Sequence, residues 1–364
     1  MSTNTMRAIQ LIANREIALG DVPRPVTPAD GLVLKTRATS ICSTDISYFE
    51  GHLIPEEYPS ILGHEYLGEV ADIGDNYVQD PRNPIGIGDR IVYWGQTDFG
   101  GFAEYRSLRP IFSGQVKTDE FYTVRDFYDD YHAAAVKVPD ELDDTVASFI
   151  EPVTGALRSI LTNPPRIGDR ILVLGSGPIG IIAGSIFAKL FAANTVDSVD
   201  LNPARNVGAK NHFAHNAYTP DELRETTEDS SYDYVFDTLP TINTSRDNDP
   251  RRLAMLKLRP RGKYVLYGAS QEMQKFDTWL MLSKGITIVA APFCVRSFPM
   301  HNSANVIGSA MRMLKHGVVN GGALGTRLCH FDDFATIKDI VHDYRSTLDL
   351  KTVIQYGDVS AAVA

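Results

Sequence analysis

A glycine-rich run, Gly175-Ser-Gly-Pro-Ile-Gly180, has the spacing G-x-G-x-x-G that suits the phosphates of a dinucleotide. It follows Ile171-Leu-Val-Leu, which is typical of a buried strand, and precedes a helix expected to begin near Ile179. The first glycine would allow a tight turn, the second the approach of a pyrophosphate, and the third close helix–strand packing. Free N–H groups at the helix N-terminus favour negative charge there. The residues expected at the phosphates are Gly175, Gly177, Pro178, Ile179 and Gly180.

An acidic residue at the end of the next strand completes this pattern. Asp200 follows the glycines by roughly 20 residues, where a carboxylate hydrogen-bonds the ribose hydroxyls of NAD and repels a 2′-phosphate. Arg205 comes soon after and could flank the adenine or the ribose. A plainer alternative is that Asp200 is an exposed turn acid before Asn202-Pro203. The order of strand, glycines, helix and acid favours dinucleotide binding, with NAD rather than NADP.

Cys42 and His64 are candidate metal ligands in the first third of the chain. Zinc takes thiolate and imidazole ligands, and a catalytic site adds one more protein ligand and leaves one position open. Either Glu65 or Glu151 could be that third ligand. Taken singly, a cysteine is more often a small buried residue and a histidine a hydrogen-bonded structural one. The spacing of Cys42 and His64 is no zinc-finger pattern, so spacing alone does not identify a metal.

The elements that must position these residues change character near Asp169. The first 150 residues are expected to form short strands between turns, in a largely antiparallel sheet. Beyond Asp169, strands alternate with helices, which predicts a parallel, doubly wound sheet. The expected strands are Arg7–Ile12, Gly31–Ser40, Tyr66–Asp72, Asp89–Val92, Arg170–Leu174, Asp197–Asp200, Tyr232–Asp237, Gly262–Tyr267 and Gly285–Ala290, with later helices at Asn305–Lys315 and Phe334–Tyr344.

Length and composition limit the classes of protein that fit. A chain of 364 residues is longer than one core usually serves, so two domains are expected. Its net charge of −10, without a basic block, argues against nucleic acid or an anionic membrane as partner. Cys42, Cys294 and Cys329 give no disulfide framework, and the first residues lack a signal-peptide pattern, so a cytoplasmic protein is expected. The apolar stretch Ile171–Ala193 contains Pro178, Lys189 and the glycine turn, which argues against a membrane helix.

Several short motifs, taken in order, resemble those of the zinc-dependent medium-chain dehydrogenases and reductases, the alcohol and polyol dehydrogenase superfamily. Such a collinear series is far more specific than any single motif. The motifs are Cys-Ser-Thr-Asp at 42–45, Gly-His-Glu at 63–65, Gly-Asp-Arg at 88–90, Gly-Phe-Ala-Glu-Tyr at 101–105, Val-Lys-Val-Pro at 136–139, Glu-Pro at 151–152 and the glycine turn.

This resemblance implies an architecture and a set of site residues. A GroES-like, mainly antiparallel catalytic domain would comprise residues 1–155 and 296–364, around a Rossmann domain at 156–295. Cys42, His64 and Glu151 match zinc-ligand positions, and Glu65 matches one that ligates zinc directly in some relatives or exchanges with water. Two further residues match positions with supporting roles in the family. Asp45 would orient the ligand histidine, and Thr44 would pass on the proton of the substrate.

Two departures from the family pattern follow. The lobe that normally carries four cysteines after Gly-Asp-Arg is absent, so one catalytic zinc and no structural zinc is expected. The aromatic and acidic segment at 117–132 is expected to be a surface excursion in its place, or else to line a substrate cleft. Ser47 stands where many relatives have a proton-relaying histidine, which leaves His52 as a candidate by proximity only.

The expected function is hydride transfer between NAD and a secondary alcohol of a polyol, sugar or (amino)cyclitol. In the family, glutamate at position 151 points to the sorbitol, glucose and threonine dehydrogenase branch. Glu50 and Arg296 could bind a polyhydroxylated or aminated ring, or could equally be ordinary solvent-exposed charges. Alternatives are a zinc-free NADPH-dependent enone or quinone reductase of the same superfamily, and a non-catalytic dinucleotide-binding protein. A homo-oligomer, dimer or tetramer, is expected through the sheet edge at Ile286–Ala290.

Overall fold

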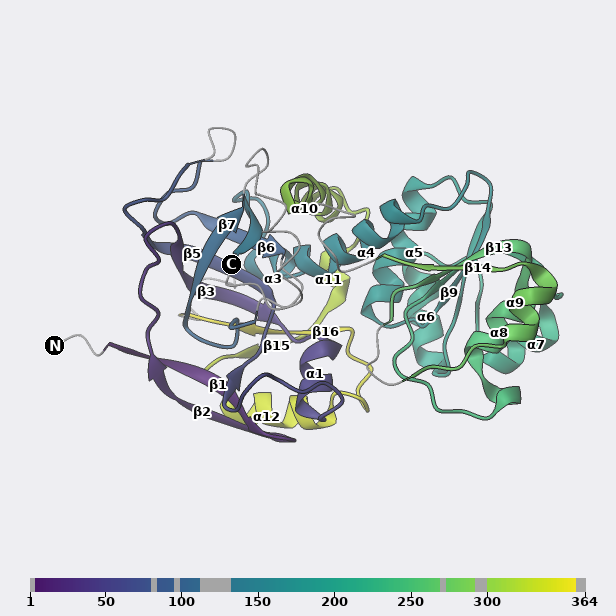
Figure 1. Ribbon diagram of the computed structural model, residues 1–364, viewed down its shortest axis with the longest axis horizontal. Coiled ribbons are helices and arrows are strands. Elements are labelled where there is room, and N and C mark those ends of the chain that lie inside the picture. The colour runs from purple at the N-terminus through teal and green to yellow at the C-terminus, as the bar shows by residue number, and fades with distance from the viewer. Residues whose placement is uncertain are drawn as a thin grey trace. The chain divides into compact units, whose positions relative to one another are not determined.

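The chain divides into two compact units in the computed structural model, which describes residues 4–79, 84–94, 99–111, 132–268, 273–291 and 300–357 (Figure 1). Unit 1 consists of Met1–Thr154, Pro292–Gly317 and Gly321–Ala364, and unit 2 of Gly155–Ala291 and Val318–Asn320. The expected last segment of the catalytic domain began at residue 296, whereas unit 1 resumes at Pro292. Val318–Asn320, which were expected in that segment, belong to unit 2.

Unit 1 is built mainly from antiparallel strands. A three-stranded sheet has the order β2-β1-β4, and a seven-stranded sheet has the order β15-β16-β3-β5-β6-β8-β7. Because β3 also pairs with β7, the strands β3, β5, β6, β8 and β7 form a closed ring. The strands are β1 (Thr5–Ala13), β2 (Glu16–Pro23), β3 (Leu32–Ser40), β4 (Ser60–Ile61), β5 (Glu65–Ile73), β6 (Arg90–Trp94), β7 (Tyr105–Ile111), β8 (His132–Lys137), β15 (Gly325–His330) and β16 (Lys351–Gln355).

Strand β3 is central to unit 1, and its sequence explains why. Leu32 and Leu34 are two residues apart and so share one face of the strand, and they pack with Tyr66 and Val70 of β5 in a buried core. The end of β3 brings the chain to Ile41 and Cys42, and β5 begins at Glu65 opposite Ser40. The candidate metal ligands therefore follow the end of one strand and begin its neighbour.

Short helices complete unit 1. They are α1 (Ser43–Phe49), α3 (Asp144–Ala147), α4 (Ile150–Thr162, which continues into unit 2), α10 (Met300–Lys315), α11 (Gly321–Leu324) and α12 (Phe334–Asp343). Helix α1 begins directly after Cys42, and its buried face, Ile46 and Phe49, packs with Ile337 and Val341 of α12. The sequence analysis did not expect α1, because seven residues are too few for a clear helical period.

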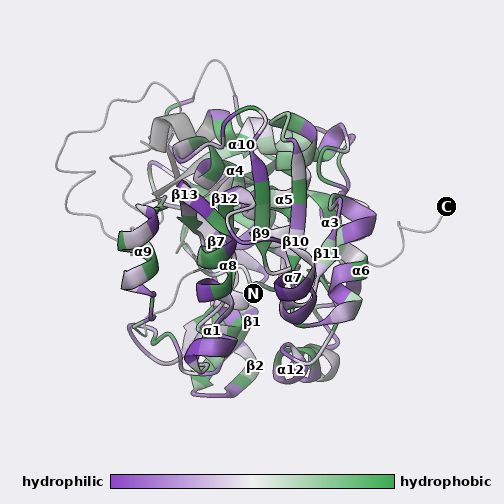
Figure 2. Cartoon of the chain, turned by 90° about the vertical axis from the view of Figure 1, so that its right-hand side faces the viewer, coloured by the Kyte–Doolittle hydropathy of each residue, from purple (hydrophilic) through white to green (hydrophobic). Residues whose placement is uncertain are grey.

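Unit 2 is a six-stranded parallel sheet in the order β11-β10-β9-β12-β13-β14. Figure 2 shows hydrophobic residues along β9, whose last four residues are fully buried. Helix α5 packs on β9 and β10, and α8 packs on β12 and β13. The elements are β9 (Arg170–Leu174), α5 (Pro178–Leu190), β10 (Thr195–Val199), α6 (Pro203–His212), β11 (Ala217–Tyr218), α7 (Pro220–Thr226), β12 (Tyr232–Asp237), η1 (Arg246–Asn248), α8 (Pro250–Lys257), β13 (Leu258–Leu266), α9 (Thr278–Lys284) and β14 (Thr287–Ala290).

The predicted fold class, an antiparallel-rich domain with a doubly wound parallel one, is confirmed. Strand β14 lies at the edge of the parallel sheet, which is the edge where an oligomer contact is expected; that contact stays a prediction. None of the helices among the described residues combines the length and the apolar character needed to cross a membrane.

Candidate metal and dinucleotide sites

Asp45 joins the two segments that carry the candidate metal ligands. Its side chain is 2% exposed, and its two oxygens accept hydrogen bonds from different loops. Oδ2 accepts the backbone N–H of Cys42 at 2.8 Å, and Oδ1 accepts that of Gly63 at 3.0 Å. The carboxylate therefore fixes the start of α1 against the loop that precedes β5. This contact positions Cys42 and His64 relative to each other.

Cys42, His64 and Glu65 form a group whose possible ligand atoms all lie within 4.8 Å of one another. His64 is buried, and its Nδ1 has no hydrogen-bond partner among the described residues; the nearest carboxylate oxygen, Asp45 Oδ1, is 3.6 Å away. Burial lowers the pKa of His64, but the negative charges of Cys42 and Asp45 outweigh burial and raise that pKa well above its usual value. Sulfur, nitrogen and oxygen donors thus face one another in a buried place.

Lys351 holds the carboxylate of Glu65. Its Nζ donates to both oxygens of Glu65, at 2.5 Å to Oε2, and the hydroxyl of Ser40 also donates to Oε2. Lys351 is 2% exposed and Glu65 is 1% exposed. Burial lowers the pKa of Lys351, but Glu65 and Cys42 raise it well above its usual value, so the lysine is charged. The carboxylate of Glu65 is therefore compensated before any metal binds.

Glu151, in the first turn of α4, is the other carboxyl of this region. It is 7% exposed, and burial raises its pKa to about 7. Positive charge at His64 and Lys351 lowers this pKa, and negative charge at Glu65 and Asp45 raises it. These effects show that Glu151 lies in the same electrostatic environment, although it is outside the group defined by the 4.8 Å distances.

Aromatic rings pack beside the metal-ligand group. The ring of Phe99 meets His64 edge to face, with centroids 5.3 Å apart, and meets Tyr48 in the same manner at 5.2 Å. Tyr344 is also in this environment, since burial raises its pKa and the charges of Lys351 and Cys42 act on it. These rings border the buried His64, where a low-polarity environment strengthens electrostatic interactions.

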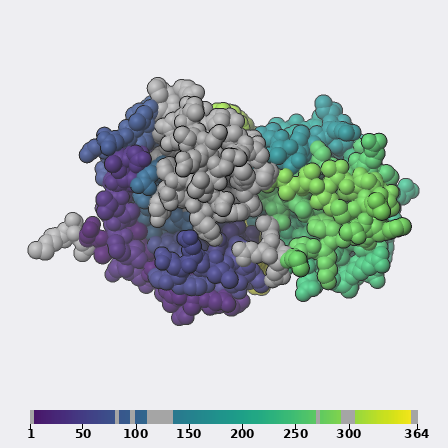
Figure 3. Space-filling model, in the orientation of Figure 1, coloured from purple at the N-terminus to yellow at the C-terminus, as the bar shows by residue number. Residues whose placement is uncertain are grey.

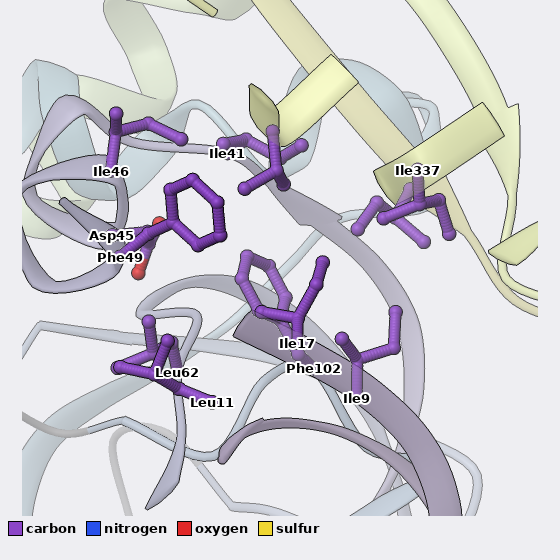
Figure 4. A pocket seen from close by; sticks show the side chains of 12 residues that line it. Ile9, Leu11, Ile17, Ile41, Asp45, Ile46, Phe49, Leu62, Phe102 and Ile337 are labelled. Carbon is purple, nitrogen blue, oxygen red and sulfur yellow. The ribbon is translucent and has the colours of Figure 1, made fainter. Parts of the chain in front are cut away.

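The opposite side of Asp45 borders an apolar cavity of about 20 Å³ (Figure 4). Figure 4 shows Ile41, Ile46 and Phe49 around this cavity, with the Asp45 carboxylate at its edge. A water molecule there would find almost no polar partner, so the cavity is part of the hydrophobic core rather than a ligand site. Asp45 is consequently held between the core and the metal-ligand group.

Three residues in α1 or directly after it, which the sequence analysis singled out, have defined partners. The Thr44 hydroxyl lies 3.6 Å from Cys42 Sγ, and the Ser47 hydroxyl donates to the backbone carbonyl of Ser43 at 3.0 Å. Glu50 is paired with Arg345, whose Nε and Nη2 lie 3.1 and 3.0 Å from Oε2. Glu50 is therefore engaged in an ion pair within unit 1, which competes with the expected contact to a substrate ring.

The glycine turn of unit 2 lies between β9 and α5. Gly175 has a φ of +92°, which favours glycine, and a side chain at Gly180 would place its Cβ 1.9 Å from the carbonyl oxygen of Gly175. At Gly177, by contrast, the nearest atom to a Cβ is Arg205 Nη1 at 3.6 Å. Gly175 and Gly180 are thus required by the fold, whereas Gly177 leaves open space at the N-terminus of α5.

Asp200 supports this turn from the end of β10. Its Oδ2 accepts the N–H of Ser176 at 2.8 Å, and its Oδ1 accepts that of Asn202 at 2.8 Å. Each carboxylate oxygen can accept a further hydrogen bond, so Asp200 can support the turn and also bind a ligand hydroxyl. Asp200 is half-buried, and its contact with Asn202 lies in the turn before Pro203, so its role in ligand binding stays a prediction.

The site residues proposed from sequence therefore fall into two groups. One, in unit 1, holds Cys42, Thr44, Asp45, His64, Glu65 and Glu151; the other, in unit 2, holds Gly175, Gly177, Pro178, Ile179, Gly180, Asp200 and Arg205. Lys351, Ser40 and Tyr344, which also belong to this region, were not predicted from the sequence as site residues. Cys294, Arg296 and residues 117–131 lie outside the described residues. Cys329 is buried, and burial raises the pKa of its thiol to about 11.

Known proteins are similar to this chain in sequence and in structure. Residues 28–112 match the family described as alcohol dehydrogenase GroES-like domain. A segment of 215 residues is 30% identical to L-threonine 3-dehydrogenase of Shewanella sp. (strain W3-18-1). The match covers 56% of this chain and 61% of that relative, so less than two thirds of the relative is spanned.

Solved structures match nearly the whole chain. The 2R,3R-butanediol dehydrogenase of Bacillus subtilis has a TM-score of 0.73 and 20% identity, over 96% of this chain and 99% of that one. Galactitol-1-phosphate dehydrogenase of Escherichia coli has a TM-score of 0.74 and 17% identity, over 96% and 100%. At such identities the similarity establishes the fold.

Proposed function

We propose that the chain is a member of the medium-chain dehydrogenase/reductase superfamily, and that it is a zinc-dependent oxidoreductase that transfers a hydride between a secondary alcohol and NAD. The observation that carries this proposal is the buried group of Cys42, His64 and Glu65, with Glu151 beside it. Thiolate, imidazole and carboxylate are the donors that zinc accepts in catalytic sites. The Nδ1 of His64 is buried and has no hydrogen-bond partner among the described residues, which supports a role for this histidine as a metal ligand.

We assign Cys42, His64 and Glu151 as the zinc ligands. Glu65 would have to leave Lys351 unpaired in a buried place in order to ligate a cation, and that exchange is costly. No hydrogen bond or ion pair from any described residue engages the carboxylate of Glu151, and a bound cation would favour its ionised form. Glu65 then compensates the charge of Lys351 beside the ligands.

Thr44 and Asp45 have separate roles in the proposed reaction. Zinc, when bound, supplies Lewis acidity that lowers the pKa of a substrate hydroxyl. Thr44, next to Cys42, would accept the proton of that hydroxyl and pass it on. Asp45 keeps the loops of Cys42 and Gly63 in register, so that the ligands keep their places through turnover.

The dinucleotide is proposed to bind at the glycine turn of unit 2. Its pyrophosphate would lie at Gly177 and the N-terminus of α5, where there is room and where the helix dipole favours anions. Asp200 supports NAD over NADP, because its carboxylate can hydrogen-bond ribose hydroxyls and repels a 2′-phosphate. Exchange of Asp200 for alanine should therefore reduce the preference for NAD over NADP, as measured by the ratio of their dissociation constants.

The substrate class is proposed as a polyol, sugar or (amino)cyclitol. Threonine, butanediol and galactitol 1-phosphate, which appear in the names of the similar proteins, all carry hydroxyl groups. A panel of such alcohols with NAD, assayed by NADH absorbance, would identify the substrate. The ion pair of Glu50 with Arg345 makes Glu50 a weaker candidate for ring recognition.

The test of the proposal is the zinc content of protein purified without added metal. We expect about one zinc per chain, and Cys42→Ala should lose this zinc and turnover while it keeps NADH binding. Cys329→Ala is the matched control, because it removes a buried thiol away from the ligand group and should keep the zinc. Zinc near zero that added metal does not restore would contradict the proposal and favour the zinc-free reductase.

A further inference from the structure

A polar depression of about 640 Å³ on unit 2 has no part in the sites described above. It is lined by Arg166, Arg259, Pro260, Arg261, Gly285 and Thr287. Its volume is within the range of small-molecule sites, roughly 300–1,000 Å³. Three of its six lining residues are arginines, in a chain whose net charge is −10.

The arginines come from separate segments. Arg166 belongs to the loop between α4 and β9, whereas Arg259 and Arg261 belong to the first part of β13. Strand β13 pairs with β12 at Leu258 and again from Lys263 onward, so the residues between them leave the regular ladder. The Nζ of Lys263 donates to the carbonyl of Pro164 at 2.9 Å, which ties β13 to the loop of Arg166. The fold therefore holds the arginines around one depression.

The charge of these arginines is only partly compensated. Arg259 is paired with Asp233, with Nε 2.5 Å from Oδ1. Arg166 and Arg261 are exposed, and among the described residues neither has an ion-pair partner. Like charges that line one depression repel each other, and an anion between them removes this repulsion. Guanidinium groups also match the oxygens of phosphate in a two-pronged geometry.

The backbone of Arg261 adds an independent observation. Its φ is +60°, in the left-handed region that glycine adopts without strain and that an arginine rarely adopts. A Cβ added at Gly285, which also lines the depression, would lie near only one atom, Arg261 Cγ at 4.0 Å. The space beside Gly285 is therefore open. An arginine at a position suited to glycine, beside an open polar space, points to a use for its side chain.

The depression is separate from the proposed dinucleotide site. Arg166 precedes β9, whereas the glycine turn follows it, and the five residues of β9 rise by roughly 16 Å. Strands β13 and β14 belong to the same parallel sheet as β9 (Figure 1), so their first residues lie at the end opposite the glycine turn. In Figure 3, the residues coloured green, which belong to the second half of unit 2, lie at the surface.

We propose that this depression binds a small phosphorylated molecule, through Arg166, Arg259 and Arg261, with the hydroxyl of Thr287 as a further donor. The phosphoryl group is recognised by its multiple negative charge and its oxygens. The site does not depend on the proposed zinc or dinucleotide chemistry, because none of its residues belongs to those groups.

The test is a calorimetric titration of the full chain with sodium pyrophosphate at constant ionic strength. We expect saturable binding, and the affinity for pyrophosphate should be at least about tenfold lower in Arg261→Gly. The affinity should be lower still in the double variant Arg166→Ala/Arg261→Gly. Glycine at position 261 suits a φ of +60°, so this variant should fold as well as the original chain. Arg15→Gly is the matched control, because Arg15 also has a positive φ, 61°, but lies in unit 1; binding should not change.

Three results would overturn the proposal. Pyrophosphate binding that is equal in Arg261→Gly and the original chain would place the anion elsewhere, for instance at the glycine turn. If Arg261→Gly changes the molecular mass measured by sedimentation but not the affinity for pyrophosphate, the arginines contact a second copy of this chain. Binding of citrate but not of pyrophosphate or inorganic phosphate would exclude a phosphoryl ligand.

Discussion

Lys351 and Glu65 are 286 positions apart in sequence, and they form a buried ion pair in which Nζ contacts both carboxylate oxygens. Lys351 begins β16 and Glu65 begins β5, and both strands pair with β3. The last strand of the chain is therefore tied to the strand that begins at Glu65, directly after His64. This tie makes the metal-ligand group dependent on the C-terminal return of the chain.

Substitution of Lys351 by methionine should strongly destabilise the protein. The change leaves the Glu65 carboxylate buried without its cation, which costs about 3–5 kcal/mol when one partner of a buried pair is removed. Urea denaturation followed by circular dichroism measures this loss. Lys137→Met is the control, because its ion pair with Asp89 is 47% exposed on the lysine side and should contribute less than about 1 kcal/mol. Equal losses in both variants would contradict the role assigned to Lys351.

The two glutamates near the ligand group should differ in their effect on zinc. Glu151→Gln removes a carboxylate ligand and should lower zinc affinity by at least about tenfold, since even outer-shell partners contribute 10–100-fold. Glu65→Gln should lower the free energy of unfolding more and zinc affinity less, because its carboxylate is held by Lys351 and Ser40. Competition with a fluorescent zinc chelator gives both affinities. The reverse order would identify Glu65 as the third ligand.

How far the sequence predicts this protein depends on how local each feature is. The strand Arg170–Leu174 and the strand Tyr232–Asp237 were predicted with the bounds that the structure has, because a short apolar run between turns is a local signal. The glycine turn is equally local, and the φ of Gly175 and the crowding at Gly180 have the expected character. Strand ends elsewhere differ by a few residues, as for β13, because its bulged first residues obscure the pattern.

The partners of the site residues could not be predicted in the same way. Lys351 follows a polar loop, and a lysine is almost always exposed, so nothing near it in sequence indicates a buried partner. The pairing of Glu50 with Arg345 also joins distant segments, 295 positions apart. Such contacts follow from strand order and helix packing, which a single sequence does not reveal.

The second and third glycines of the turn should respond differently to alanine. Gly180→Ala would bring a Cβ to 1.9 Å from a backbone oxygen, so helix α5 must shift; we expect a loss of about 1–3 kcal/mol, as for other overpacked sites. Gly177→Ala meets nothing closer than 3.6 Å and should leave the melting temperature nearly unchanged. It should nevertheless weaken NADH binding by at least about tenfold, because the methyl group occupies the place proposed for the pyrophosphate. NADH fluorescence titration checks this, and unchanged affinity in Gly177→Ala would argue against a dinucleotide at this turn.

Asp277 should make stability depend on pH in the acid range. Its carboxylate accepts the N–H groups of Leu280 and Trp279 at the start of α9 and is paired with Arg252, and these contacts lower its pKa below the usual value of 3.8. A carboxyl whose folded pKa is lowered stabilises the fold above its unfolded pKa, and that contribution disappears as pH falls through the folded pKa. Because asparagine is also a good N-cap but carries no charge, Asp277→Asn should be modestly destabilising at pH 7 and almost neutral once the pH is below the folded pKa. Urea denaturation at several pH values measures this difference, with exposed Asp75→Asn as control. A loss that stays constant over the whole pH range would mean that the charge of Asp277 does not contribute.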